Sequence, residues 1–280
     1  MPELGGRVRT IRVYLPKGYD GGTTSYPVLY LQDGQQLFAP GPFGDWLIDE
    51  TLDRVGDEGH TAGLIVVGID NGDHRWDEYG PWVNREMHAW ISESWARAAE
   101  GGDGKAYVHF VAETLKPAVD GKYRTIRDRA HTGIGGSSMG ALIAVYAGLT
   151  RPDVFSRVLG MSTAVWFAEG GGPWLSHNRL LQLIGTTPPP PNVRFYLDVG
   201  THERSRDTDP DVSDDRGRPV SYARAYVEGS EALAEALRHG GAPSGNVRLL
   251  IDAGAMHHES AWAKRFESAV LWLYQQEGSR

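Results

Sequence analysis

The chain reads Ile134-Gly135-Gly136-Ser137-Ser138-Met139-Gly140 near its middle, between a strand-like and a helical run. It contains the pattern Gly-x-Ser-x-Gly once, centred on Ser138. A short β-rich run, residues 131–134, leads into it, and an almost wholly apolar helical run, residues 139–149, follows it. A strand, a sharp turn and a helix form the context of a nucleophile elbow. The stretch therefore predicts a reactive serine at Ser138 in an α/β protein.

The residue types around Ser138 fit this interpretation. A serine in an elbow has a strained backbone that lifts its hydroxyl clear of the sheet. The residues two before and two after it crowd each other, which explains Gly136 and Gly140. The backbone N–H of Met139 begins a helix and is a predicted oxyanion donor. The alternative is a glycine-rich turn whose serine only faces solvent.

Strand-like and helical runs alternate on both sides of this stretch. The strand-like runs are residues 8–15, 28–31, 64–69, 131–134, 158–161, 193–199 and 247–251. The helical patterns are residues 46–55, 105–119, 139–149, 222–238 and 261–274. Unbroken Val, Ile and Leu runs are typical of strands buried on both faces. The pattern predicts an α/β fold with a mostly parallel central sheet flanked by helices, in one domain over residues 1–280.

Two segments interrupt the alternation, residues 73–102 and 167–183, and both are rich in tryptophan. The tryptophans near or within them are Trp76, Trp82, Trp90, Trp95, Trp166 and Trp174. They can be ordinary packing, or loop and lid walls of a pocket for an apolar or aromatic substrate. We select Trp82 and Trp166 as candidate substrate contacts.

Composition excludes several classes of protein. Of 280 residues, 40% are hydrophobic and 23% charged, which suits a folded core. Cysteine is absent, so disulfides, thiolate metal sites and cysteine nucleophiles are excluded. The formal charge of −8 argues against nucleic-acid binding. No apolar run is long enough for a membrane helix, and residues 1–12 show no signal-peptide pattern, so we expect a cytoplasmic protein without membrane contact.

A serine nucleophile needs a base. In proteins with a nucleophile elbow, the catalytic residues follow one another in the chain order serine, acid, histidine. His257 and His258 both follow the last predicted strand, where the base belongs. The preceding strand offers two acids, Asp198 within the strand and Glu203 in the loop after it. We favour Glu203, which would orient the imidazole and stabilise its cation. A solvated loop carboxylate is the alternative.

A second oxyanion donor is expected from the loop after an early strand. Gln35 follows Asp33-Gly34 in such a loop, and its backbone N–H is the candidate. Arg75 could contact an anionic or hydroxylated substrate group, or it could pair with Glu78. Residues 207–211 resemble the start of a calcium loop, but Val212 and Arg218 stand where glycine and glutamate are needed. A solvated acidic loop is the better interpretation, and we predict no metal site.

Several motifs now follow one another in a familiar order. They are Gln32-Asp33-Gly34-Gln35-Gln36, Asp70-Asn71-Gly72, Gly136-Ser137-Ser138-Met139-Gly140, Gly200-Thr201-His202-Glu203 and His257-His258-Glu259-Ser260-Ala261-Trp262. Together they resemble the esterase D-like (enterochelin esterase-like) family of α/β-hydrolases. That family includes enterochelin esterases, feruloyl esterases and mycolyltransferases. The resemblance covers the chain from about Val8 to Tyr274.

The resemblance implies specific roles. Ser138 matches the family nucleophile, His257 its base, Glu203 its acid, and Gln35 the second oxyanion amide. Some siderophore-esterase relatives are described as working with a Ser–His pair, which leaves the need for Glu203 open. Gln32 departs from the pattern, because many relatives have histidine there.

The sequence thus predicts a serine carboxylic ester hydrolase that forms an acyl-enzyme and needs no metal or organic cofactor. Its expected partner is a small-molecule ester, while the acyl group, the alcohol and the oligomeric state stay open. Two alternatives are kept. One is an acyltransferase with the same triad, and the other is a non-catalytic binding module on a hydrolase fold.

Overall fold

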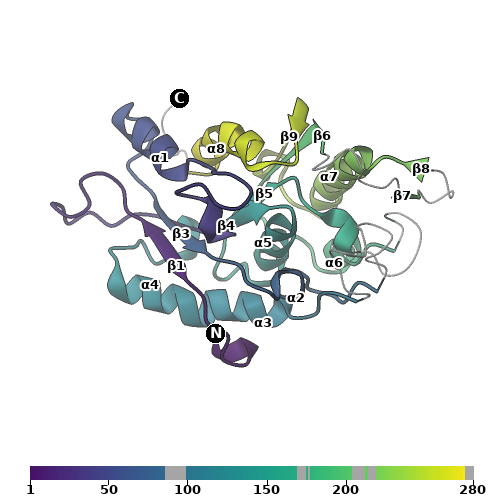
Figure 1. Cartoon of the computed structure of the whole chain (residues 1–280), viewed down its shortest axis with the longest axis horizontal. Coiled ribbons are helices and arrows are strands. Elements are labelled where there is room, and N and C mark those ends of the chain that lie inside the picture. Colours follow the sequence, from purple (N-terminus) through teal and green to yellow (C-terminus); the bar gives the residue numbers. More distant parts are fainter. Residues whose placement is uncertain (86–98, 169–174, 176, 204–211, 214–218, 275–280) are drawn as a thin grey trace.

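The structure is a computed structural model, which describes residues 1–85, 99–168, 175, 177–203, 212, 213 and 219–274. Its centre is a seven-stranded sheet in the order β1-β3-β2-β4-β5-β6-β9 (Figure 1). The strands are β1 Ile11–Tyr14, β2 Val28–Gln32, β3 Ile65–Ile69, β4 Thr132–Ser137, β5 Arg157–Met161, β6 Arg194–His202 and β9 Val247–Met256. β1 is antiparallel to β3 and all other neighbours are parallel. The predicted mostly parallel α/β sheet is confirmed.

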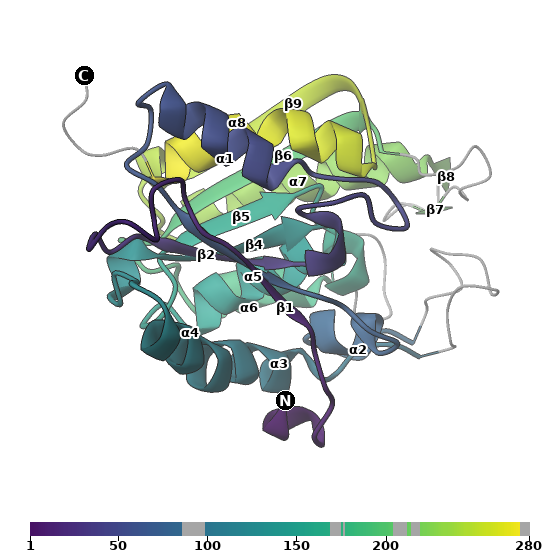
Figure 2. The same ribbon diagram turned by 60° about the vertical axis from the view of Figure 1, so that its left-hand side comes forward.

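Helices cover both faces of the sheet (Figure 2). One face carries α1 Ile48–Asp57 and α8 Glu259–Tyr274. The other carries α3 Gly104–His109, a π-helical turn Phe110–Leu115, α4 Lys116–Lys122, α5 Met139–Thr150, α6 Arg179–Thr186 and α7 Tyr222–His239. The short helix α2 Arg75–Tyr79 lies beside α3, and β7 Val212–Ser213 pairs with β8 Pro219–Val220.

Side chains of the inner strands alternate between two cores. Leu29, Leu31 and Leu159 point into the core under α1 and α8. Val28, Tyr30 and Val158 point into the larger core under α5 and α7. Successive strand side chains face opposite sides of a sheet, and here both sides are covered, which explains the unbroken apolar runs in the sequence.

All seven strand-like runs and all five helical patterns correspond to observed elements. The predicted helix 105–119 is three consecutive helical pieces, α3, the π turn and α4. Two predictions of irregular structure were incomplete, because α2 lies in the first tryptophan-rich segment and most of α6 in the second. Trp90, Trp95, Trp174 and the acidic loop 207–211 lie outside the described residues.

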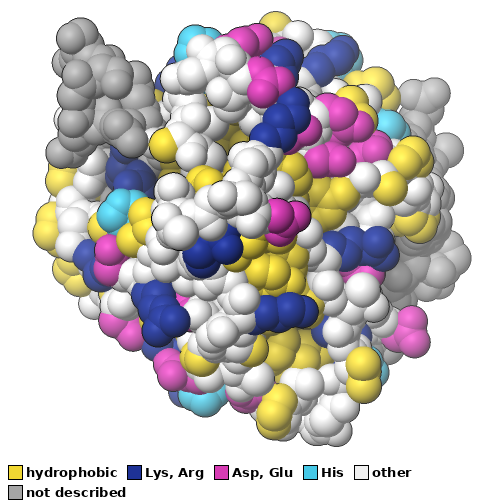
Figure 3. Space-filling model, turned by 90° about the vertical axis from the view of Figure 1, so that its left-hand side faces the viewer, with side chains coloured by type: hydrophobic (Ala, Val, Ile, Leu, Met, Phe, Trp, Pro, Cys, Tyr) yellow, Lys and Arg dark blue, Asp and Glu magenta, His cyan; other side chains and the backbone are white. Residues whose placement is uncertain are grey.

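Two surface properties follow from the described residues. Acidic and basic side chains are interspersed over the described part of the face in Figure 3, so that face carries no broad basic patch. No described helix combines the length and the apolar character required to cross a membrane.

Candidate active site

Ser138 stands between β4 and α5 with φ 55° and ψ −119°, a strained backbone for a residue with a side chain. A Cβ on Gly136 would lie 2.9 Å from the carbonyl carbon of Gly140. A Cβ on Gly140 would lie 2.8 Å from Cβ of Gln32. The expected crowding of the two glycines is confirmed. The second neighbour, Gln32 at the end of β2, was not foreseen from the sequence.

Both candidate oxyanion amides lie where helical hydrogen bonds have not yet begun. Leu142 N–H donates to the Ser138 carbonyl at 3.1 Å, so the N–H of Met139 precedes the first such bond of α5. Gln35 lies in the short 3₁₀ turn Gly34–Gln36, whose first turn bond is Gln36 N–H to the Asp33 carbonyl at 3.1 Å. β2 and β4 are adjacent and parallel, so both amides come from the carboxyl ends of neighbouring strands.

His257 and Glu203 are brought together from the ends of the adjacent strands β9 and β6. His257 Nδ1 lies 2.6 Å from Oε2 of Glu203, whose side chain is wholly buried. His258, the other candidate base, is exposed, and its Nδ1 lies 2.9 Å from Oγ of Ser260. Of the two histidines, the one paired with a buried carboxylate is therefore His257.

The Glu203 carboxylate is held in its ionised form. Its second oxygen, Oε1, accepts a hydrogen bond of 2.6 Å from Ser162 Oγ and another from the Gly200 N–H. Burial by itself raises the pKa of Glu203, but the hydrogen bonds and the charge of His257 outweigh it and lower that pKa below its ordinary value. An ionised, fully bonded carboxylate fixes the tautomer of the imidazole with Nδ1–H toward Glu203.

Asp198, the alternative acid, has a different partner. Arg265 Nη2 lies 3.0 Å from Oδ1 of Asp198, and both side chains are buried. Burial raises the pKa of Asp198 to about 7, against the opposing effect of Arg265. Asp198 thus belongs to a buried ion pair beside the site.

Tyr226 of α7 connects the serine with the histidine. Its hydroxyl lies 3.4 Å from Ser138 Oγ, and its ring centroid lies 4.8 Å from that of His257. Trp262 packs edge-on against the imidazole, at 5.0 Å. Sequence reasoning missed Tyr226, because nothing distinguishes it from the other apolar positions of helix 222–238. Ser138 and His257 thus both contact one aromatic side chain, and Glu203 contacts His257.

Arg75 pairs with Asp33 and not with Glu78, the partner considered as one of two alternatives from the sequence. Nε and Nη2 of Arg75 lie 2.8 Å from the two Asp33 oxygens. Glu78 instead forms ion pairs with Arg7 and Arg9. Nη1 of Arg7 lies 3.1 Å from Oε1 of Glu78, and Nη2 of Arg9 lies 2.5 Å from the same oxygen. The tertiary fold brings Asp33, at the end of β2, closer to Arg75 than the neighbour three residues along its own helix.

The two selected tryptophans differ in position. Trp166 is buried and packs on Tyr226 at 6.5 Å, so it lies directly behind the site. Trp82 is half-buried and packs on Tyr146 of α5 at 5.5 Å. Their contact with substrate stays a prediction, as does that of Arg75.

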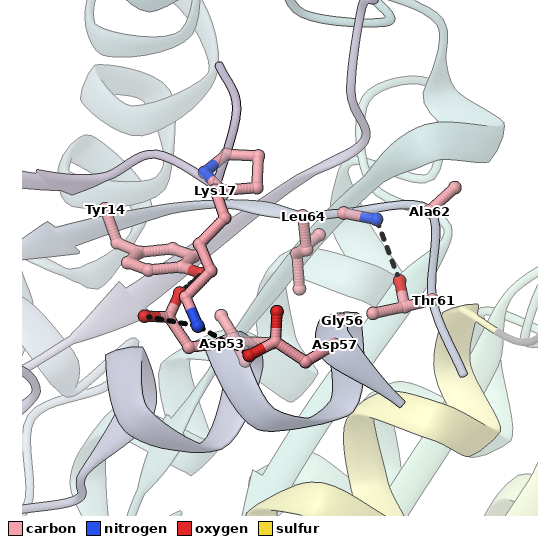
Figure 4. Close-up of a pocket in the computed structure, with 11 residues that line it drawn as sticks. Tyr14, Lys17, Asp53, Gly56, Asp57, Thr61, Ala62 and Leu64 are labelled. Carbon is pink, nitrogen blue, oxygen red and sulfur yellow. Dashed lines mark hydrogen bonds and ion pairs between the residues drawn. The ribbon is translucent and has the colours of Figure 1, made fainter. Parts of the chain in front are cut away.

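Figure 4 shows a pocket of about 210 Å³, whose lining contains none of the residues of this site. It is lined by Tyr14, Asp53, Asp57 and the residues just before β3, at the amino end of that strand. Lys17 closes it with Nζ 2.6 Å from Asp57 and 3.7 Å from Asp53. Sites in α/β sheets lie at the carboxyl ends of the strands, so this pocket is not the place of the chemistry. Among the described residues, no cluster of three metal-binding side chains occurs.

Residues 3–273 match the family described as "Putative esterase". The chain belongs to this esterase family. The resemblance expected from the sequence is confirmed, and carboxylic ester hydrolysis is the chemistry of the family. Bacillus subtilis YbbA is 24% identical over 267 residues, which cover 95% of this esterase and 92% of YbbA.

Solved structures share the fold of this esterase. An IroE-like serine hydrolase from Shewanella oneidensis has a TM-score of 0.71 and 19% identity, over 95% of this chain and 76% of that one. The enterobactin esterase of Shigella flexneri has a TM-score of 0.68 and 18% identity. That match covers 95% of this chain but only 55% of the enterobactin esterase, so the esterase described here spans about half of that protein's length.

Proposed function

We propose that this esterase is a serine hydrolase of small-molecule carboxylic esters that uses Ser138, His257 and Glu203 as a triad. The observation that carries the proposal is the 2.6 Å contact between His257 Nδ1 and the buried, ionised Glu203. Tyr226 contacts both His257 and Ser138, whose backbone is strained. Burying a carboxylate carries a large desolvation cost, and buried ionisable groups with specific charge partners cluster at functional sites.

The proposed reaction begins with proton transfer. Nδ1–H of His257 donates to Glu203, so Nε2 carries the lone pair and acts as the base. As Ser138 Oγ attacks the ester carbonyl carbon, its proton moves to Nε2, and Glu203 stabilises the resulting imidazolium. The carbonyl oxygen becomes an oxyanion, which the amides of Met139 and Gln35 stabilise.

The acyl-enzyme forms when the C–O bond to the alcohol breaks and His257 protonates the departing alkoxide. Water then repeats the sequence. Its proton goes to His257, its oxygen attacks the acyl carbon, and Ser138 Oγ leaves and regains a proton from His257. Every proton is returned, so the cycle requires no cofactor.

Hydrogen bonds and close packing hold the loop that contains Gln35 in place. Asn71 N–H donates to the side-chain carbonyl of Gln35 at 3.1 Å, and Asn71 Nδ2 donates to Asp33 at 2.5 Å. A Cβ on Gly34 would lie 2.6 Å from the carbonyl carbon of Gly68, so the turn passes directly over β3. Such fixed amides need no reorganisation as charge develops, which is the condition for oxyanion stabilisation.

The test is covalent labelling with a fluorophosphonate, together with release of nitrophenol from nitrophenyl acetate. The wild-type protein should be labelled at Ser138 and should turn over the ester. Ser138→Ala and His257→Ala should lose both signals, whereas Ser137→Ala and His258→Ala serve as matched controls that keep them. A folded wild-type protein that resists labelling, or a Ser138→Ala variant with full activity, contradicts the proposal and favours a binding module.

Hydrolysis and acyl transfer share these steps and differ only in what attacks the acyl-enzyme. Products are therefore separated at increasing concentrations of an added alcohol or sugar acceptor. Free acid at every acceptor concentration supports the hydrolase. A transferred ester that replaces the acid as the acceptor rises would show an acyltransferase instead.

A further inference from the structure

Tyr226 places a buried phenol at the proposed nucleophile. Its side chain is 1% exposed, and its hydroxyl lies 3.4 Å from Ser138 Oγ. This contact is a hydrogen bond of the Ser138 hydroxyl with a described residue. At 3.4 Å it is longer than the 2.7–2.8 Å that is usual between hydroxyl groups, so it is weak at rest and has room to shorten.

The phenol is held in place from several sides. Tyr222, one turn earlier on α7, has its hydroxyl 3.5 Å away and its ring edge-on at 5.2 Å. Trp166 packs edge-on against Tyr226 at 6.5 Å. The tilted ring of His257 covers it at 4.8 Å. Its hydroxyl therefore stays close to Ser138 without help from substrate.

The phenol also keeps its proton. Burial raises the pKa of Tyr226 above its ordinary value, although hydrogen bonds with Ser138, Tyr222 and Trp166 oppose this. A neutral phenol can donate its O–H to an oxygen that gains negative charge. Ser138 Oγ, at 3.4 Å, is the neighbouring oxygen that gains charge in the proposed reaction.

We propose that Tyr226 is a further catalytic residue, whose phenol O–H donates a hydrogen bond to Ser138 Oγ while that oxygen carries negative charge. This rests on the proposed serine hydrolase function. During attack, the Oγ–H bond breaks, the proton goes to His257 and the Oγ–C bond forms. During deacylation, the Oγ–C bond breaks and the electron pair returns to Oγ, which takes its proton from His257. Tyr226 keeps its own proton throughout.

This role differs from that of a pocket wall. Phenylalanine keeps the ring against His257 and Trp166 but removes the hydroxyl. If Tyr226 only lines the pocket, Tyr226→Phe should therefore leave catalysis unchanged. If Tyr226 donates to Ser138 Oγ, the substitution should slow catalysis, because the lost hydrogen bond is strongest in the transition state. Loss of such a bond lowers kcat and leaves KM nearly unchanged.

The structure offers a matched control. Tyr196 is also buried, and its hydroxyl donates to Ser268 Oγ at the same 3.4 Å, in the other core under α8. Tyr226→Phe and Tyr196→Phe thus each remove one tyrosine–serine contact of equal length. Only the first contact involves the proposed nucleophile.

The experiment compares wild type, Tyr226→Phe and Tyr196→Phe on nitrophenyl acetate from pH 5 to 9, with melting temperatures for all three. For Tyr226→Phe we expect kcat and the rate of fluorophosphonate labelling to fall together by about ten- to a hundred-fold, below the full effect of an oxyanion donor. KM should not change. The pH at which kcat falls to half its maximum on the acidic side of its pH profile, here called the midpoint of the acidic limb, should not change either. Tyr196→Phe should keep wild-type kcat and labelling rate.

Two results would overturn the inference. Wild-type kcat and labelling in a folded Tyr226→Phe protein mean that the hydroxyl has no catalytic role. A shifted acidic limb means that Tyr226 acts through His257 and not on Ser138. Either result leaves the proposed hydrolase intact as long as Ser138→Ala is inactive. If Ser138→Ala is itself active, the hydrolase proposal fails first.

Discussion

The carboxylate of Asp33 accepts two hydrogen bonds from the guanidinium of Arg75, from Nε to Oδ1 and from Nη2 to Oδ2, both at 2.8 Å. Asp33 has the left-handed φ of 57° and directly precedes Gly34 and Gln35. Bidentate pairs between arginine and carboxylate are geometrically specific as well as strong. The pair therefore fixes the start of the loop whose Gln35 amide we assign to the oxyanion hole.

Arg75→Lys tests this link. Lysine keeps the positive charge but presents a single flexible ammonium in place of the planar fork. We expect kcat on nitrophenyl acetate, a neutral ester, to fall about tenfold, less than when an oxyanion donor is removed outright. KM should stay near its wild-type value. Steady-state kinetics on the purified variant measures both.

Arg12→Lys is the control, because Arg12 forms an equally bidentate pair with Asp70, at 2.8 and 3.0 Å, in an exposed position on β1. Its kcat should not change. If Arg75→Lys raises KM for anionic esters alone and leaves kcat intact, Arg75 binds substrate and does not position the loop.

Gly140→Ala tests the crowding under the elbow. Alanine normally favours a helix over glycine by about 0.5–1 kcal/mol. Here its Cβ would meet Gln32 Cβ at 2.8 Å, so either β2 or the elbow must shift. We expect a loss of about 1–3 kcal/mol in the free energy of unfolding, as for an overpacked core. Esterase activity should fall with it, because Ser138 moves.

Gly185→Ala is the matched control on α6, since no atom lies within 4 Å of the Cβ that it adds. It should keep activity and leave stability unchanged or slightly higher. Urea unfolding and nitrophenyl acetate assays on both variants decide the point. A Gly140→Ala protein that is stabilised and fully active would show that the close approach of Gln32 is unimportant.

The sequence was informative where a feature is local. Strands buried on both faces read as unbroken apolar runs, and the elbow carries its own glycine pattern. α6 was missed because it begins inside a segment interpreted as irregular. Its start does carry a local signal, since the Asn178 side chain accepts from the N–H groups of Leu180 and Leu181 at 3.1 and 3.2 Å.

The sequence was silent where a contact depends on how elements pack. Tyr226 reaches Ser138 only because α7 packs against β6 and β9. Ser162 reaches Glu203 because β5 and β6 end side by side. Spacing along the chain favours Glu78 as the partner of Arg75, but the fold supplies Asp33. Neither periodicity nor motif encodes such tertiary neighbours.

Ser162→Ala tests the support of the acid. Ser162 Oγ donates to Glu203 at 2.6 Å and accepts from Trp262 Nε1 at 2.9 Å, so it links the carboxylate to a ring that packs on His257. Its loss removes one hydrogen bond that keeps the pKa of Glu203 low. We expect kcat to fall about three- to tenfold, the size of one such bond, with KM unchanged.

Ser156→Ala provides the comparison at the opposite end of β5. Ser156 is buried and donates to the Arg129 carbonyl, also at 2.6 Å. It precedes the first residue of β5, whereas Ser162 follows the last one, where the proposed site lies. Both variants should lose some thermal stability, and only Ser162→Ala should lose kcat. Equal kinetics for the two variants would mean that Ser162 merely stabilises the fold.

Glu259 makes the stability of the fold depend on pH. It begins α8, is 6% exposed, and faces the charges of His257, Asp33 and Arg75. Burial raises its pKa from 4.5 to about 7, against the opposing effects of its own backbone N–H and of His257. Between these two values the folded protein holds a proton that the unfolded chain releases.

The sign follows from this difference in bound protons. The contribution of Glu259 to stability is complete below pH 4.5 and is lost as the pH rises through about 7. Glutamine at this position cannot titrate. Glu259→Gln should therefore match the wild type near pH 5 and exceed it at pH 8, by about 1–3 kcal/mol of unfolding free energy. Urea unfolding at both pH values measures the difference.

Glu267→Gln is the control on the same helix. Glu267 is partly exposed, and its hydrogen bond from Arg54 lowers its pKa, so its removal should not produce a gain at pH 8. Parallel stability curves for the wild type and Glu259→Gln across this range would show that Glu259 is ionised at pH 5 already, and that the environment at the start of α8 is more polar than its burial implies.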